Sequence, residues 1–93
     1  MTGSYEVAYS SGYTYTGKGG FYRSTVSAKN KALKYDDKVV SITWTSAKNP
    51  MYAFLDEYIS MIKYGAPHSQ KTYNKIASPG RKYFYKIYGY YLD

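Results

Sequence analysis

The clearest alternation of apolar and polar residues in this chain lies at 39–45, where Val-Val-Ser-Ile-Thr-Trp-Thr is rich in β-branched residues and flanked by turn residues. The pattern predicts a strand, in which alternate side chains face opposite sides. Val40, Ile42 and Trp44 are expected to face the core, and the residues between them to face the other way. Trp44 is therefore predicted to be largely buried.

Alternation also marks the residues before this strand. Residues 1–20 carry tyrosines at alternate positions around Ser10-Ser11-Gly12, which predicts a β-hairpin or a mobile arm. Residues 21–26 alternate as well and predict a strand. Residues 33–35 predict a short strand that ends in a tight turn at Asp36-Asp37.

Spacings of three and four replace alternation after Asn49-Pro50. Apolar residues recur at this spacing from Met51 to Ile62, behind an N-cap asparagine and a proline at the first helical position. Gly65 follows as a C-cap, so a helix is predicted over residues 50–64. A second, shorter helix is predicted over residues 69–76. Its inward side chains are expected to be Thr72, Tyr73 and Ile76.

The C-terminal residues 78–93 allow two interpretations. As a strand, they would place aromatic side chains on both faces, and aromatic residues favour strands. As a helix, they would begin with Ser78 as N-cap and Pro79 at the first position, and end at Gly89 in a left-handed conformation. The start and stop signals favour the helix.

Strands followed by helices predict the α+β class. The expected architecture is a small antiparallel β-sheet from the N-terminal half, packed against two or three helices from the C-terminal half. A chain of 93 residues has room for one hydrophobic core. The division expected is an N-terminal hairpin or arm at 1–20 and a single α+β domain at 21–93.

The composition narrows the chemistry. The chain has 15 tyrosines and three leucines, so its core must be unusually aromatic. It has no cysteine, which excludes disulfides and thiolate metal sites. No apolar run of transmembrane length and no signal peptide are visible, so a cytoplasmic location is expected. A secreted protein that has lost its signal peptide is the alternative.

Residues that could carry catalysis do not form a recognisable set. His68 is the single histidine, and the adjacent pairs Asp36-Asp37 and Asp56-Glu57 are expected to point in different directions. No Gly-x-Ser-x-Gly elbow is present, and Gly17-Lys18-Gly19-Gly20 lacks the spacing of a phosphate-binding loop. The prediction is a protein that is not an enzyme and uses no metal or cofactor.

The remaining signal is basic residues interleaved with tyrosines in a chain of net charge +7. Aromatic rings stack on bases while lysine and arginine neutralise phosphates, which is how single-stranded nucleic acid is bound without sequence preference. Core packing is the alternative role for some of the tyrosines. The candidate binding residues are Lys63, Tyr64, Lys71, Lys75, Arg81, Lys82, Tyr85 and Lys86.

Short motifs in the second half give a partial resemblance to the KTSC domain, a small family named from the C-terminus of some lysyl-tRNA synthetases. Tyr35-Asp36 precedes the strand, and Tyr52-Ala53-Phe54 is similar to the family's Tyr-x-Tyr motif. Ser78-x-Gly80-x-x-Tyr83-x-x-x-Ile87-x-x-x-Tyr91 resembles its tail. The resemblance covers roughly residues 35–91, and it implies a small accessory domain for which RNA binding is the usual suggestion.

The same surface has a second interpretation. A small bacterial or phage-encoded inhibitor or adaptor would use tyrosine, lysine and arginine to bind an acidic protein. The N-terminal strands, with Tyr5, Tyr9, Tyr13 and Tyr15, could also pair with a second copy as an edge hairpin. Tyrosines inside one basic groove would favour nucleic acid, and an apolar patch rimmed by charge would favour a protein.

Overall fold

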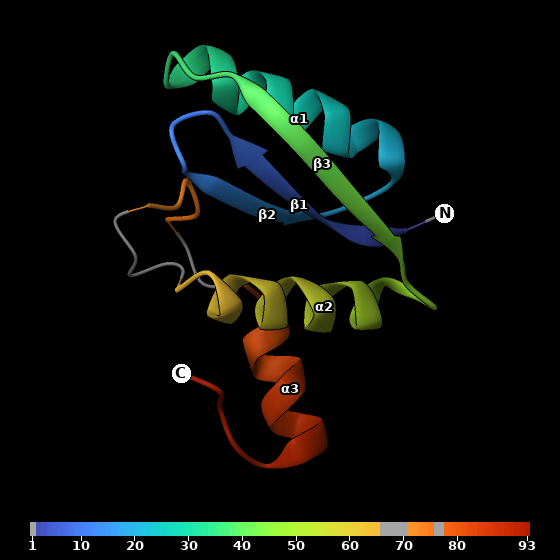
Figure 1. Cartoon of the computed structure of the whole chain (residues 1–93). Coiled ribbons are helices and arrows are strands. Elements are labelled where there is room, and N and C mark those ends of the chain that lie inside the picture. Colours follow the sequence, from blue (N-terminus) through green and yellow to red (C-terminus); the bar gives the residue numbers. More distant parts are fainter. Residues whose placement is uncertain (1, 66–70, 76–77) are drawn as a thin grey trace.

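The computed structural model describes residues 2–65, 71–75 and 78–93 (Figure 1). In these residues three strands and three helices form the predicted α+β fold, with an antiparallel sheet in the order β2-β1-β3. The elements are β1 (Gly3–Tyr9), β2 (Thr14–Lys18), α1 (Phe21–Lys34), β3 (Val39–Ser46), α2 (Pro50–Lys63) and α3 (Gly80–Tyr88).

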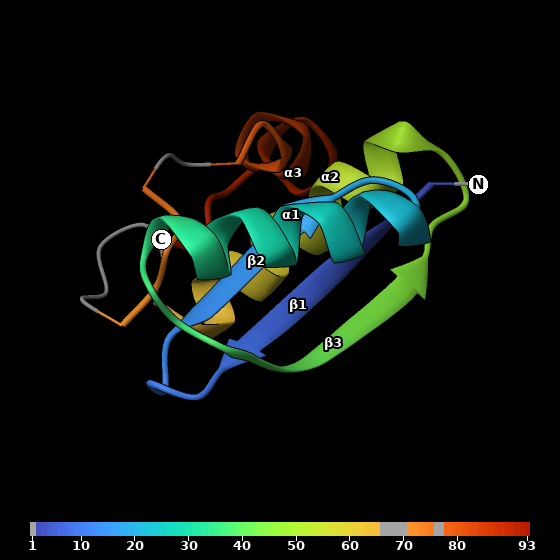
Figure 2. The same cartoon turned by 90° about the horizontal axis from the view of Figure 1, so that it is seen from above.

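The central strand β1 separates the two faces of the sheet. Tyr5, Val7 and Tyr9 point to one face and are buried beneath α1, while Glu6 points to the other face, toward α2. Figure 1 shows α1 and α2 on opposite sides of the sheet, with α3 beyond α2. Figure 2, turned by 90°, shows α1 lying along the strands and β3 at one edge. β1 and β2 form the predicted hairpin.

Helix α1 replaces the two strands predicted at 21–26 and 33–35, and these two predictions are wrong. Ser24 and Ala28 on α1 are completely buried, and the Tyr9 hydroxyl donates a hydrogen bond to the Ala28 carbonyl oxygen at 3.1 Å. The large residues that suggested alternation lie outside, as Tyr22 at 80% exposure shows. The true periodicity is a spacing of four between small residues, which lets the helix approach the sheet closely.

Strand β3 forms as predicted, but with an irregularity that changes its faces. Val39 pairs with Tyr9 and Ser41 pairs with Ala8, which leaves Val40 as an extra residue in a bulge. Val40 was expected to face the core and is instead 67% exposed. Trp44 packs on the core yet is only partly buried, because β3 is an edge strand; its indole N–H donates to the Gly19 carbonyl oxygen at 3.0 Å.

Helix α2 is confirmed with the predicted start. The Asn49 side chain accepts a hydrogen bond from the Tyr52 backbone N–H at 3.1 Å, and Pro50 occupies the first turn. Gly65, just past the helix, has the left-handed φ of 78° that a helix end favours. Four residues of α2 are buried between the sheet and α3, namely Ala53, Leu55, Tyr58 and Met61.

Helix α3 confirms the helical interpretation of the C-terminal residues. Its N-cap is Pro79, one residue later than expected, and the Ser78 hydroxyl accepts from the Gly80 backbone N–H at 3.1 Å. Gly89 ends it with a φ of 79°. Phe84 packs edge-on against Tyr58 of α2, with ring centroids 5.6 Å apart, and this contact attaches α3 to the body of the protein.

Residues 71–75 do not form the predicted helix, because they pair with the edge of β2. The Tyr73 N–H donates to the Thr14 carbonyl oxygen at 2.8 Å, and the Thr14 N–H donates to that of Lys71 at 3.1 Å. Farther along, the Asn74 side chain accepts from the Thr16 N–H and donates to the Thr16 carbonyl oxygen, both at 2.8 Å. Thr72 and Tyr73 are buried as predicted, whereas residues 69, 70 and 76 lie outside the described residues.

The Asn74 side chain satisfies the backbone of Thr16 as a neighbouring strand would, so its removal should destabilise the fold. In Asn74→Ala, the N–H and carbonyl of Thr16, a residue only 2% exposed, lose their partners. We expect the free energy of unfolding to fall by about 2–3 kcal/mol and the exchange of the Thr16 amide hydrogen to speed up. Urea titration and hydrogen exchange measure both. Asn30→Ala, on the exposed side of α1, should change stability by less than about 0.5 kcal/mol, and equal losses in both variants would contradict this role.

Candidate functional site

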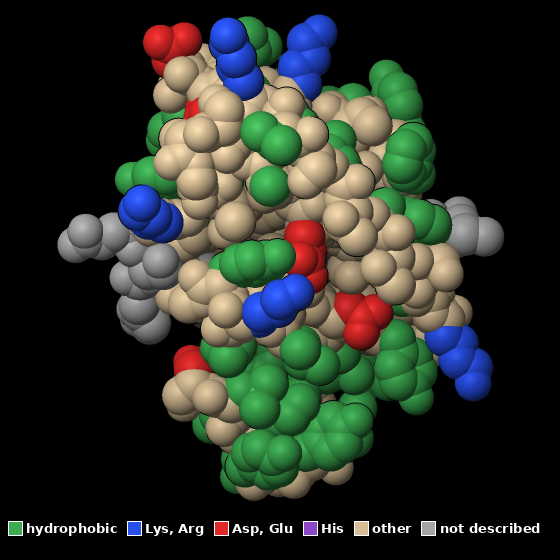
Figure 3. All heavy atoms as spheres, in the orientation of Figure 1, with side chains coloured by type: hydrophobic (Ala, Val, Ile, Leu, Met, Phe, Trp, Pro, Cys, Tyr) green, Lys and Arg blue, Asp and Glu red, His purple; other side chains and the backbone are tan. Residues whose placement is uncertain are grey.

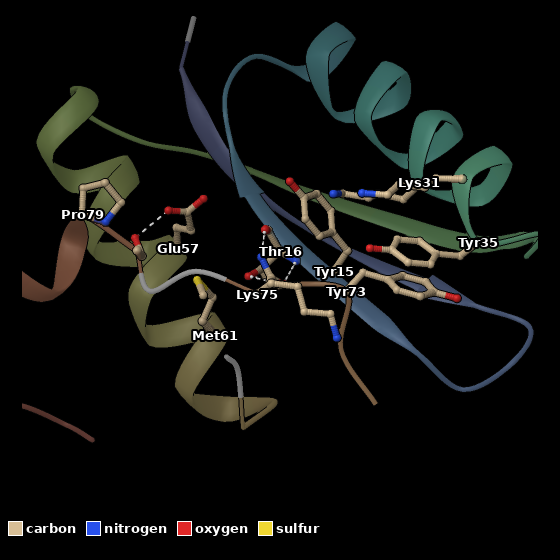
Figure 4. A pocket seen from close by; sticks show the side chains of 12 residues that line it. Tyr15, Thr16, Lys31, Tyr35, Glu57, Met61, Tyr73, Lys75 and Pro79 are labelled. Carbon is tan, nitrogen blue, oxygen red and sulfur yellow. Dashed lines mark hydrogen bonds between the residues drawn. The ribbon is translucent and has the colours of Figure 1, made fainter. Parts of the chain in front are cut away.

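A cleft of about 400 Å³ opens beside the edge of β2 (Figure 4). Its walls come from the end of α1, from β2, from α2, from residues 73–75 beside the edge of β2 and from Ser78 and Pro79. Seven of the lining side chains define its chemistry. They are Tyr15, Tyr35 and Tyr73, then Lys31, Lys34 and Lys75, and finally Glu57.

Tyr73 holds the aromatic wall of the cleft. Its ring stacks on that of Tyr35, with centroids 4.2 Å apart and planes 9° from parallel. Tyr13 and Tyr9 contact the same ring at 4.8 Å and 5.1 Å, the second of them edge-on. Three separate segments of the chain therefore orient Tyr73, and Tyr73 in turn supports the ring of Tyr35.

A carboxylate fixes the far end of Tyr73. The Tyr73 hydroxyl donates to Asp37 at 2.6 Å, and Asp37 also accepts from the backbone N–H of Lys38 at 2.8 Å. The hydroxyls of Ser10 and Ser11 donate to it as well. These bonds, led by Ser11 and then Tyr73, hold the pKa of Asp37 far below its usual value. Burial and the bond to Asp37 raise the pKa of Tyr73, which stays neutral.

The three lysines supply positive charge around the rings. Lys31 and Lys34 are three residues apart on α1 and so share a face of the helix. The Lys31 ammonium lies 5.0 Å from the centroid of the Tyr15 ring, and that of Lys34 lies 5.3 Å from the Tyr35 centroid. Lys75 donates to the Thr72 carbonyl oxygen at 3.1 Å. In the part of the chain that the structure describes, none of the three forms an ion pair.

Glu57 is the one carboxylate of the cleft. It accepts a hydrogen bond from the Ser78 hydroxyl at 2.5 Å. Burial raises its pKa, against the lowering effects of that bond and of the nearby Lys18 and Arg23. In Figure 4 Glu57 lies beside Pro79, away from Lys31 and Tyr35. Burial also raises the pKa of Tyr15 to about 12, so this hydroxyl remains a neutral donor.

The arrangement is suited to binding. Aromatic faces with ammonium groups beside them can hold a planar ligand that carries negative charge. Within the described ranges, no group of three or more histidines, cysteines and carboxylates could hold a metal ion. None of the helices described is both long enough and apolar enough to cross a membrane.

The predicted binding residues lie in three separate places. Lys75 lines the cleft, and Lys71 lies on the same segment. Lys63 and Tyr64 lie at the end of α2, where both contact Glu6: the Tyr64 hydroxyl donates to it at 2.5 Å and the Lys63 ammonium lies 3.7 Å away. The other four are on α3, and they are Arg81, Lys82, Tyr85 and Lys86.

Helix α3 carries an apolar surface rather than a groove. Figure 3 shows hydrophobic side chains gathered over the lower lobe, which is α3 in Figure 1. Arg81 lies 3.7 Å from the centroid of the Tyr91 ring and pairs with Asp93 at 3.1 Å. The large apolar side chains that remain at least 40% exposed here form the α3 patch, defined as Tyr85, Ile87, Tyr88, Tyr90, Tyr91 and Leu92.

Most residues of the cleft were missed from the sequence. Lys31, Lys34 and Tyr35 are adjacent in space only because residues 21–34 are helical, whereas two short strands were predicted there, at 21–26 and 33–35. Their spacing of three and four was the available signal. Tyr15 and Tyr73 could not have been linked by any local pattern, because one lies on β2 and the other joins its edge from far along the chain.

Comparisons of the chain with protein-family models, curated proteins and solved structures found no match.

The carboxylate that holds Tyr73 should make stability depend on pH. Because the folded-state pKa of Asp37 is lowered, its stabilising effect is present above the ordinary aspartate value of about 4 and is lost as the pH falls through the folded pKa. Asp37→Asn should melt at a lower temperature than the unsubstituted protein at pH 7. The gap should narrow steadily below about pH 4.

Thermal melts between pH 2 and pH 8 measure this gap. Asp36→Asn is the matched control, since it removes the same charge from the exposed neighbour, whose φ of 51° asparagine accepts readily. Melting curves of Asp37→Asn that run parallel to those of the unsubstituted protein at every pH would show that Asp37 does not stabilise the fold in this way.

Proposed function

We propose that this chain is a non-catalytic module that binds RNA or another single-stranded nucleic acid in the cleft beside β2. The observation that carries the proposal is the position of Lys31 and Lys34 over the rings of Tyr15 and Tyr35, in a cleft that Lys75 also lines. Unpaired bases have exposed faces that stack on tyrosine, and the phosphates between them attract lysine. The partial resemblance to the KTSC family agrees with this assignment.

The fixed rings favour binding of an unpaired strand over a duplex. Tyr35 is backed by Tyr73, which Asp37 and Tyr9 hold in place. A base that stacks here would meet a surface already ordered, so little side-chain entropy would be lost on binding. A duplex hides its base faces and would offer only its phosphates to the lysines.

Binding should depend strongly on salt. Three lysine–phosphate contacts predict a slope of about −2 for the logarithm of the association constant against that of the salt concentration, at about 0.7 per phosphate for single strands. We expect a labelled oligouridine to bind at low salt with this slope. Lys31→Gln with Lys34→Gln should reduce the slope by about 1.4 and weaken binding. Fluorescence anisotropy in a salt series measures both quantities.

The matched control removes two charges elsewhere. Lys29 and Lys48 are exposed and do not line the cleft, so Lys29→Gln with Lys48→Gln should leave most of the slope intact. Equal weakening by both double variants would assign binding to general charge rather than to the cleft. Absence of binding to any single strand at low salt would reject the proposed function.

The α3 patch favours a second candidate function, which is binding of an acidic protein. Tyr88 and Tyr90 are 57% and 56% exposed, and aromatic residues in such a position are typical interface anchors. Lys82 and Lys86 lie on the same helix as part of the patch, while the neighbouring carboxylate of Asp93 is already paired with Arg81. The uncompensated charge therefore favours a partner with an acidic rim around an apolar surface.

A crosslinking experiment tests this candidate. A photo-crosslinking residue at Tyr88 should capture an acidic protein from nuclease-treated native cells, whereas one at Asn30 should not. The purified partner should then bind the unsubstituted chain and bind Tyr88→Ser with a loss of about 2 kcal/mol, as expected for a hot-spot aromatic. Capture of a second copy of this chain, or equal binding of Tyr88→Ser, would overturn the acidic-partner assignment.

A further inference from the structure

A second hollow of about 320 Å³ continues from the cleft along β2. It shares Tyr15, Glu57 and Pro79 with the cleft, so the two hollows adjoin each other beside β2, and we refer to them together as the groove. New cations line this second part, namely Lys18 at the end of β2 and Arg23 in the first turns of α1.

The groove is open here because the residue of β2 that follows Thr16 has no side chain. Asn74 covers the backbone of Thr16, but Gly17 follows with no side chain. A Cβ atom at Gly17 would overlap the ring of Tyr5, which lies across the strand at this point. The hydroxyl end of Tyr5, a residue only 2% exposed, therefore lines the second hollow beside Gly17.

The two cations of the second hollow resemble those of the cleft in their surroundings. The Lys18 ammonium lies 4.6 Å from the centroid of the Phe54 ring. Neither Lys18 nor Arg23 forms an ion pair in the described ranges, although both attract the Glu57 carboxylate from a distance. Within the described residues, a phosphate bound here would displace no ion pair, and Lys18 lies close to an aromatic ring.

Glu57 lies where the two hollows meet and divides the positive charge of the groove. A phosphate placed beside this carboxylate would be repelled, whereas a sugar hydroxyl or a base amino group could donate to it. The cations therefore form two groups on either side of Glu57, one with Lys31 and Lys34 and the other with Lys18 and Arg23. This arrangement suits a flexible chain that carries phosphates at intervals.

The length of the groove matches a short strand. Arg23 and Lys34 are eleven residues apart on α1, or about 16 Å at 1.5 Å per residue. That distance is the rise of roughly five stacked nucleotides at 3.4 Å each, and of fewer if the strand is extended. A mononucleotide could not reach both groups of cations.

We propose that the hollow around Lys18 and Arg23 is a second phosphate-binding subsite, so that the ligand is a strand of several nucleotides that passes Glu57 and contacts both ends of the groove. The inference rests on the proposed function, because it assigns the length of the ligand that the cleft would bind. It also predicts that short and long oligonucleotides will distinguish the two subsites.

The test compares a 5′-phosphorylated uridine trinucleotide with an octanucleotide. For the unsubstituted chain, the octanucleotide should bind more tightly, with a salt slope steeper by about 1.4 for two added phosphate contacts. Lys18→Gln with Arg23→Gln should abolish this gain in slope and leave the affinity for the trinucleotide unchanged. Competition against a labelled octanucleotide measures both ligands, and circular dichroism melts verify that each variant is folded.

The possible outcomes distinguish the second phosphate-binding subsite from the proposed function on which it rests. Trinucleotide binding that depends on Lys31 and Lys34, with no gain for the octanucleotide, would overturn the second subsite and leave the proposed function intact. An effect of Lys18→Gln with Arg23→Gln no larger than that of Lys29→Gln with Lys48→Gln would overturn the subsite as well. Failure of both ligands to bind would reject the proposed function, and this inference with it.

Discussion

The close packing of α1 on β1 is the central contact of this fold. Ser24 and Ala28 are small enough for the helix to lie against the face formed by Tyr5, Val7 and Tyr9, and the hydrogen bond from Tyr9 to the Ala28 carbonyl fixes its position. A larger residue at either helical position would push α1 away from the sheet. Because α1 is held there, its last turns lie above β2, and the lysines of those turns reach the edge of that strand.

The side-chain amide of Asn74 attaches the segment that forms another wall of the cleft. Asn74 satisfies both backbone groups of Thr16, so a segment far along the chain is held against β2 without forming a long strand of its own. This attachment places Tyr73 against Tyr35 and brings Lys75 to the same opening. The cleft therefore depends on the two buried hydrogen bonds between Asn74 and Thr16 as well as on the aromatic core.

Elements with strong local signals in the sequence could be predicted, whereas features that depend on tertiary packing could not. Asn49-Pro50 and Gly89 marked helix boundaries because capping is decided within a few residues, and β3 was visible from its β-branched run. Helix α1 was missed because its buried face consists of small residues, whose burial cannot be seen in a hydrophobic pattern. The bulge at Val40 was missed because it arises from pairing with β1. Of the eight candidate binding residues, Lys75 is the one that lines the cleft.

Local patterns in the sequence predicted the α+β class and the positions of β3 and α2, favoured a helix at α3, and gave a net charge of +7 that can attract anions. These properties follow from local propensity, capping and composition. Tertiary packing alone brings particular members of the thirteen basic residues together and sets the tyrosines that they face. Lys75 lies far along the chain from Lys31 and Lys34, so their meeting depends on the packing of α1 against the sheet and on Asn74, and neither contact leaves a local pattern in the sequence.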